Sequence, residues 1–198
     1  DLISNPNPIS PNPKIIFISA LLLGLLIPFG VLYFIFLFDT KIHSRGDIDD
    51  ANLNLNIVGE IPFFDLDEKE KVFTNPDDRS IISESFRMLM SNVRYLQNQD
   101  SKSNVIVITS SIKGEGKTLN ALNLALSFSS VGKKTLLIGC DLRNPQLHKY
   151  LDINKNIPGL SDYLVDNKID WRKNNLRPFD HHQNLDILLS GPLPPNPL

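Results

Sequence analysis

The sequence is poor in the residues on which several classes of protein depend. Its single cysteine, Cys140, excludes an internal disulfide framework and suits a reducing compartment. No arginine-rich tract or basic–aromatic pattern is present, so we expect no nucleic-acid binding. His181 and His182 are adjacent, but no nearby cysteine or carboxylate–histidine spacing completes a metal site, and we expect a loop there. Cys140 itself is expected to be a small packing residue rather than a nucleophile.

One long stretch, Ile15 to Phe38, contains no charged residue. As a helix it would be roughly 36 Å long, which is enough to cross a bilayer with some tilt. The stretch is too long for the core of a signal peptide, and no small-residue cleavage site follows it. We therefore predict a transmembrane helix over 15–38, in which Pro28 is tolerable.

Basic residues orient this span. Only Lys14 precedes it, whereas its other end is followed closely by Lys41, His43 and Arg45. The positive-inside rule then predicts that the carboxyl-terminal side is cytoplasmic. Residues 1–14 form a proline-rich extracytoplasmic stub in this interpretation, and residues 39–79 form a juxtamembrane connector.

The most informative motif runs from Ser110 to Thr118, with the sequence SSIKGEGKT. Apolar residues 104–109, expected to form a central parallel strand, lead into it, and a helix over 119–131, ended by Gly132, is expected to follow. This strand–loop–helix context is that of a phosphate-binding loop. Its glycines let the backbone wrap a phosphate, and the helix start adds free N–H groups. The expected nucleotide-binding residues are Ser111, Lys113, Gly114, Glu115, Gly116, Lys117, Thr118 and Leu119.

Within this loop two side chains have expected chemical roles. Lys117 is placed to reach the outer phosphates, and the Thr118 hydroxyl to help hold Mg²⁺. Residues 134–138 are expected to form a second parallel strand, which completes a right-handed β–α–β unit with 104–109 and 119–131. A second motif follows this strand, where Asp141 is a candidate magnesium ligand or a group that orients the attacking hydroxyl. Arg143 is a candidate for a catalytic role beside the phosphates. The alternatives are a turn-forming role for Asp141 and a structural ion pair for Arg143.

An amphipathic helix is predicted over 80–97, because apolar residues recur at helical spacing and Ser80 is a suitable cap. Glu84 and Arg87 fall on its polar face. Two interpretations stay open for them: an exposed face with an i,i+3 ion pair, or a surface for a partner subunit.

The order of the predicted helices and strands indicates the fold class. A short extended segment over 57–62, a short helix over 159–165 and a strand over 184–189 complete the elements. We expect a doubly wound α/β fold, that is, a P-loop NTPase-type parallel sheet flanked by helices, incomplete within 80–198 and preceded by one transmembrane helix.

These motifs, in this order, resemble those of the bacterial tyrosine kinases fused to polysaccharide chain-length determinant proteins. The loop over 110–118 is similar to the family's Walker A motif, and 136–143 to its Walker A′ motif. Residues 84–89 are similar to the start of its oligomerisation helix. Residues 56–62 are similar to the segment that precedes the family's kinase domain, and residues 159–164 and 191–197 are similar to family loops. The resemblance covers nearly the whole chain, from the family's second membrane span to just after Walker A′.

This resemblance implies a function. It implies a membrane-anchored, ATP- and Mg²⁺-dependent tyrosine autokinase of the bacterial inner membrane, with its kinase domain in the cytoplasm. Such a kinase regulates the chain length and export of exopolysaccharide or capsule. The implied partners are other copies of itself, which meet through Glu84 and Arg87 and phosphorylate one another, the polysaccharide polymerase and export machinery, and a cognate phosphatase.

The chain departs from the family pattern in several places. Gly139 stands where the family has the first Walker A′ aspartate, and Met90 where the oligomerisation motif has its second arginine. A Walker B motif and a tyrosine-rich tail would follow Leu198. Lys113 is one residue away from the signature lysine of partition-type ATPases, so we expect it to be a solvated loop residue. The alternatives are therefore a catalytically weak nucleotide-binding scaffold, or a partition-type ATPase.

Overall fold

A computed structural model describes residues 12–39, 41–50, 55–67, 70–98, 100–166, 168–174, 176 and 178–192. Most of the proline-rich stub and the end of the loop over 191–197 lie outside the described residues. The chain divides into two compact units, Asp1–Asn56 and Ile57–Leu198.

The first unit contains a long apolar helix, α1, over Pro13–Phe38. The Asn12 side chain accepts a hydrogen bond from the Lys14 N–H, and the proline at the first turn needs no such partner. Pro28 lies inside the helix, which continues through it. Among the described residues α1 is the one helix long and apolar enough to cross a membrane, which agrees with the span predicted over 15–38. A short helix, α2, over Arg45–Asp50 was not predicted.

The second unit is built on a parallel pair of strands, β1 over Thr135–Ile138 and β2 over Leu185–Leu188. Thr135 pairs with Leu185 and Ile138 with Leu188. Between the strands the chain forms α5 (Leu147–Leu151), α6 (Leu160–Val165) and a 3₁₀ turn (Trp171–Asn174). The strands and α6 were predicted to within one residue at each end.

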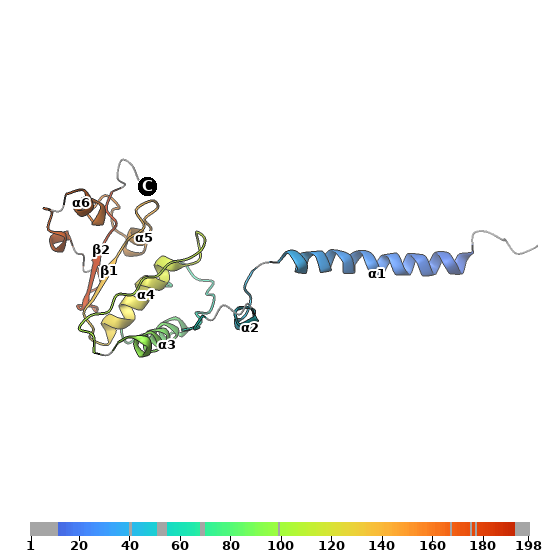
Figure 1. Ribbon diagram of the computed structural model, residues 1–198, viewed down its shortest axis with the longest axis horizontal. Coiled ribbons are helices and arrows are strands. Elements are labelled where there is room, and N and C mark those ends of the chain that lie inside the picture. Colours follow the sequence, from blue (N-terminus) through green and yellow to red (C-terminus); the bar gives the residue numbers. More distant parts are fainter. Residues whose placement is uncertain are drawn as a thin grey trace, which may run out of the picture. The chain divides into compact units, whose positions relative to one another are not determined.

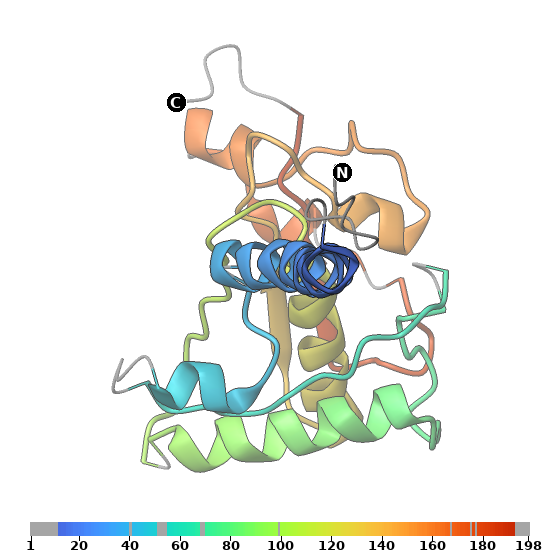
Figure 2. The same ribbon diagram turned by 90° about the vertical axis from the view of Figure 1, so that its right-hand side faces the viewer.

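Two helices lie against this pair in successive layers. Helix α4, Lys117–Ser130, packs against the strands, and α3, Ile81–Leu96, packs against α4 (Figures 1 and 2). The Ser80 hydroxyl caps α3 as predicted, by accepting from the Ser83 N–H. Gly132, at a φ of 78°, follows the end of α4, also as predicted.

The core of the second unit lies between these layers. Phe86 of α3 and Leu122 and Leu126 of α4 are fully buried, as are Leu185 and Ile187 of β2. Burying each of these side chains stabilises the fold by about 1.5–3 kcal/mol relative to leaving it exposed. The apolar stripe that predicted α3 is therefore its packing face.

The prediction of a first strand over 104–109 is wrong. The structure assigns no strand there or over 57–62, and Val105 and Val107 are 91% and 82% exposed. A strand needs a neighbour for its backbone groups. In the part of the chain that the structure describes, β1 pairs with β2 and β2 also bridges Leu176, whereas residues 104–109 pair with neither strand. The predicted β–α–β unit through α4 is thus replaced by a parallel crossover from β1 to β2 through α5 and α6.

Candidate nucleotide-binding site

The glycine loop has the backbone conformation that only glycine adopts without strain. Gly114 and Gly116 have φ values of 97° and 85°, in the left-handed region. Gly116 is the residue immediately before α4, and its carbonyl accepts the first helical bond, from the Asn120 N–H at 2.9 Å. Nothing lies within 4 Å of the place that a Cβ on Gly114 would take, so the outer side of the loop is open.

The amino end of α4 is free of side-chain caps. Its first N–H groups therefore keep their hydrogen-bonding capacity, and the helix dipole adds a partial positive charge there. Lys117 and Thr118 are the first two residues of the helix and, with Leu119, are half-buried. A helix start of this kind, entered through left-handed glycines, is suited to bind an anion.

The rest of the loop is held by its own side chains. The Ser110 hydroxyl donates to the Ile112 carbonyl at 2.9 Å, and a Glu115 carboxylate oxygen accepts from the Ile112 N–H at 3.3 Å. Ser111 and Lys113 are exposed, in agreement with the solvated lysine expected at 113. Glu115 thus shapes the turn through an ordinary loop contact, which does not depend on nucleotide.

Asp141 and Arg143 follow the carboxyl end of β1. Asp141 is half-buried, and its Oδ1 accepts from the Asn144 N–H at 2.9 Å. This is the turn-forming contact that was the alternative for this residue. Arg143 is exposed. The catalytic roles of Asp141 and Arg143 stay predictions.

The donors expected to hold Mg²⁺ suit that ion in kind. A threonine hydroxyl and a carboxylate supply the oxygen ligands that Mg²⁺ prefers, and it commonly uses only one or two protein groups beside phosphates and water. Across the described residues, no three His, Cys, Asp or Glu side chains gather as a metal site. Thr118 and Asp141 therefore fit an ion that binds together with a nucleotide better than one resident in the protein alone.

Gly139 lies between the carboxyl ends of the two strands. Its N–H donates to the Leu188 carbonyl at 2.9 Å. A Cβ atom added at this position would lie 2.8 Å from the Ser190 hydroxyl oxygen and 3.1 Å from the Ser190 nitrogen. A side chain at position 139, where the family pattern has an aspartate, would therefore require Ser190 to shift.

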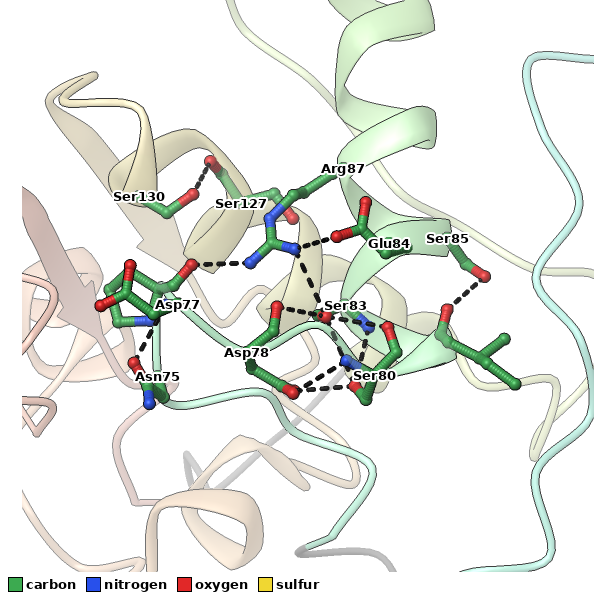
Figure 3. A network of polar contacts seen from close by, with 12 residues as sticks. Asn75, Asp77, Asp78, Ser80, Ser83, Glu84, Ser85, Arg87, Ser127 and Ser130 are labelled. Atoms are coloured by element: carbon green, nitrogen blue, oxygen red, sulfur yellow. Dashed lines mark hydrogen bonds and ion pairs between the residues drawn. The ribbon is translucent and has the colours of Figure 1, made fainter.

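Glu84 and Arg87 contact each other inside the chain. Arg87 Nη1 lies 2.6 Å from Glu84 Oε1, and Nη2 donates to the Pro76 carbonyl, also at 2.6 Å (Figure 3). The guanidinium also lies 6.0 Å from the centre of the Phe73 ring. The predicted i,i+3 ion pair is confirmed, and the use of these residues between subunits stays a prediction. Met90, in place of the second motif arginine, is buried in the interior.

Two other sequence predictions have clear outcomes. Cys140 is exposed, so its prediction as a packing residue is wrong, because the backbone after β1 turns outward into the 141–144 turn. His182 is buried, and its ring packs edge-on against Phe73 and Phe179. The histidine pair thus includes a core residue, and no metal group forms around it in the described residues.

Sequence reasoning missed Asn123 and Ser190, which are both buried. Asn123 interrupts an otherwise apolar stripe in the sequence LNALNLALS, which is the available signal for a buried polar contact. Ser190 gives no local signal.

One hollow in the described surface has a volume of about 370 Å³ and is lined by Lys134, Trp171 and Asp186, among others. It lies at the amino ends of the strands, opposite to the ends at which α/β folds bind ligands.

The comparisons with known proteins agree with this architecture. No protein-family profile matches the chain. Tyrosine-protein kinase YwqD of Bacillus subtilis is 34% identical over 132 residues, which cover 65% of this chain and 52% of that protein. The chain is homologous to bacterial tyrosine-protein kinases. Tyrosine-protein kinase wzc of Salmonella typhi is 26% identical over 98% of this chain and 28% of its own length.

A solved structure supports the same assignment. The BceF tyrosine kinase domain matches with a TM-score of 0.63 and 27% identity, over 79% of this chain and 65% of that one. The resemblance drawn from the motifs and the fold class are thereby confirmed. The chain spans about half the length of the first curated relatives that it matches, at 52% and 53%.

Proposed function

We propose that this chain is the nucleotide-binding part of a membrane-anchored protein tyrosine autokinase. The observation that carries the proposal is the uncapped start of α4, entered through Gly114 and Gly116 in left-handed conformations. Homology to tyrosine-protein kinases selects phosphoryl transfer among the reactions that such a loop supports.

In this proposal each loop residue has a defined task. The backbone N–H groups of the loop and the Lys117 ammonium would hold the β- and γ-phosphates of ATP. Thr118 and Asp141 would hold Mg²⁺, which neutralises phosphate charge when it is bound. Arg143 would stabilise charge beside the phosphates.

The chemical step is a phosphoryl transfer to tyrosine. The phenol oxygen of a tyrosine from a neighbouring copy forms a bond to the γ-phosphorus, the bond to ADP breaks, and the phenol loses its proton. The protein contributes by positioning the groups and stabilising charge.

The cellular role follows from the kinase relatives and from α1. We infer that α1 anchors the protein in the bacterial inner membrane, with the second unit in the cytoplasm, where ATP is available. There it would regulate the assembly and export of surface polysaccharide, acting with the polymerase and export machinery and opposed by a phosphatase.

The test of the kinase proposal is phosphotyrosine formation with Mg-ATP in the full-length protein. Lys117→Met should abolish labelling, whereas Lys133→Met, which alters an exposed lysine outside the loop, should leave most of it. Labelling that survives Lys117→Met would contradict the assignment.

One observation favours a second candidate, a nucleotide-binding scaffold without transfer activity. Position 139 is Gly, where the family pattern has an aspartate, so one expected metal ligand is missing. Nucleotide binding without any phosphotyrosine, together with normal polymer length in a Lys117 variant that still binds ATP, would support the scaffold.

A further inference from the structure

Part of the connector that follows the membrane helix in sequence is docked into the core of the second unit. We name residues 71–78 the docked segment. Val72 and Phe73 are buried within the core cluster, where Phe73 contacts Phe86 of α3. The segment then turns and leads into α3.

A single side chain of α4 holds this segment by its backbone. Asn123 Nδ2 donates to the Lys71 carbonyl at 2.8 Å, and Asn123 Oδ1 accepts from the Phe73 N–H at 3.2 Å. These two backbone groups flank Val72, and they are the pair that a residue of a neighbouring β-strand would bond. The asparagine amide thus takes the place of a paired strand.

These two hydrogen bonds, here called the clamp, are directional and costly to break, because the Asn123 side chain that makes them is desolvated. Asn123 has no exposed surface. A buried amide that loses its partners costs about 1–3 kcal/mol, and hydrogen bonds weaken steeply when their angles change. The docked segment therefore follows Asn123 when α4 shifts or turns, or it is released.

The same helix carries the phosphate loop at its amino end. Asn123 lies six residues after Lys117, within the fourteen residues of α4. A helix of this length moves largely as one body, because its backbone hydrogen bonds lie along its axis. A phosphate that fixes the start of α4 also fixes the clamp.

We propose that Asn123 is a positioning residue that couples nucleotide binding at the start of α4 to docking of the connector. The proposal rests on the proposed function only in assuming that the loop binds nucleotide. Coupling between sites is reciprocal, so connector docking in turn favours nucleotide binding. The segment that leads from the membrane helix thereby senses the state of the nucleotide site.

The structure offers a matched control. Asn92 of α3 also holds the connector by its backbone, since its Nδ2 donates to the Val58 carbonyl at 2.8 Å. It makes the same kind of contact from a helix that does not carry the phosphate loop. Asn123→Leu and Asn92→Leu each remove side-chain hydrogen bonding to the connector backbone, two bonds at the buried Asn123 and one at the exposed Asn92, and they differ in the helix that they disconnect.

The experiment measures hydrogen exchange in the full chain in detergent micelles, with and without saturating Mg-ADP. ADP is chosen because it cannot donate a γ-phosphate. Binding of Mg-ADP is measured separately by calorimetry for each protein. In the wild type we expect exchange of the Phe73 amide to slow at least about fivefold when ADP binds. Asn123→Leu should still bind ADP but lose this slowing, and Asn92→Leu should keep it.

Each outcome has a distinct meaning. If wild-type protein binds Mg-ADP and the Phe73 amide does not respond, the coupling is refuted while the nucleotide site stands. If Mg-ADP does not bind at all, the proposed nucleotide-binding function is contradicted, and the coupling that depends on it is contradicted as well. A response that persists in Asn123→Leu also overturns the role of Asn123. Should this variant not fold, Asn123→Ala replaces it, and the wild-type comparison alone still decides whether coupling exists.

Discussion

The hydroxyl oxygen of Ser190 lies 2.8 Å from the place that a Cβ atom on Gly139 would take. These residues follow the paired ends of β1 and β2, where the Gly139 N–H bonds the Leu188 carbonyl. A side chain at 139 would therefore be crowded by Ser190, which would have to shift to admit it.

Introducing the family's aspartate should therefore destabilise the fold. We expect Gly139→Asp to lower the free energy of unfolding by about 1–3 kcal/mol, as overpacking does. Ser190→Ala removes the atom nearest to the new Cβ, so the double variant should recover part of this loss. Urea unfolding, followed by the fluorescence of Trp171, the sole tryptophan, measures both effects. Equal stability of Gly139→Asp and the wild type would contradict the packing argument.

The second prediction concerns Gly116 and Gly132, the two glycines on either side of α4. Gly116 and Gly132 both have positive φ, at 85° and 78°, so alanine is strained at either position. Each substitution should cost about 1 kcal/mol of stability. Only Gly116→Ala also alters the start of the helix, so it alone should weaken nucleotide binding, by at least about tenfold. Calorimetric titration with Mg-ADP distinguishes them, and equal weakening in both would remove the loop from the binding site.

The third prediction concerns Arg87, whose contacts with Glu84 and the Pro76 carbonyl lie within one chain. Arg87→Gln loses the Glu84 pair and the bond to the Pro76 carbonyl, and we expect it to cost about 1.5–3 kcal/mol. Glu84→Gln alters the more exposed partner, whose side chain is 54% exposed, and should cost under about 1 kcal/mol. Both are measured by urea unfolding. A pure interface role predicts the opposite pattern: unchanged unfolding for Arg87→Gln, with a change in oligomeric state by light scattering.

Local patterns in the sequence predicted those elements whose formation depends on local chemistry. The uncharged run predicted α1, and the apolar stripe together with Ser80 predicted α3. The glycines predicted the loop and the start of α4. The short strands were predictable because turn residues bound each of them. In all these cases the determining residues lie within one helix or turn of one another.

The failures concern pairing and packing between distant segments. Residues 104–109 have the composition of a central strand, but a strand forms only where a neighbour supplies hydrogen bonds, and composition does not reveal that neighbour. The exclusion of a side chain at 139 depends on Ser190, and the clamp on the connector joins Asn123 to Lys71. No local pattern encodes such contacts, so the site's expected residue types were predictable and their packing was not.

The last prediction concerns pH and His182. Its ring is buried, and neither nitrogen has a hydrogen-bond partner among the described residues. Burial lowers the pKa of His182 below its ordinary value of 6.5, an effect that the nearby Thr74 backbone opposes. Below about pH 6.5 the unfolded chain therefore binds a proton that the folded chain resists. Stability should be fully present above this pH and fall as the pH drops towards the lower, folded pKa, with a slope of at most about 1.4 kcal/mol per pH unit.

His182→Leu should remove this slope at modest cost, because the apolar contacts with Phe73 and Phe179 are kept and only the interaction with the Thr74 backbone is lost. His181→Gln, at the exposed neighbour, is the matched control and should keep the slope. Burial also lowers the pKa of His148, so a smaller dependence of the same sign should remain in His182→Leu until His148 is replaced as well. Urea unfolding at pH 7.5 and 5.5 measures these differences. An unchanged slope in His182→Leu would show that His182 is protonated as readily in the folded protein as in the unfolded chain.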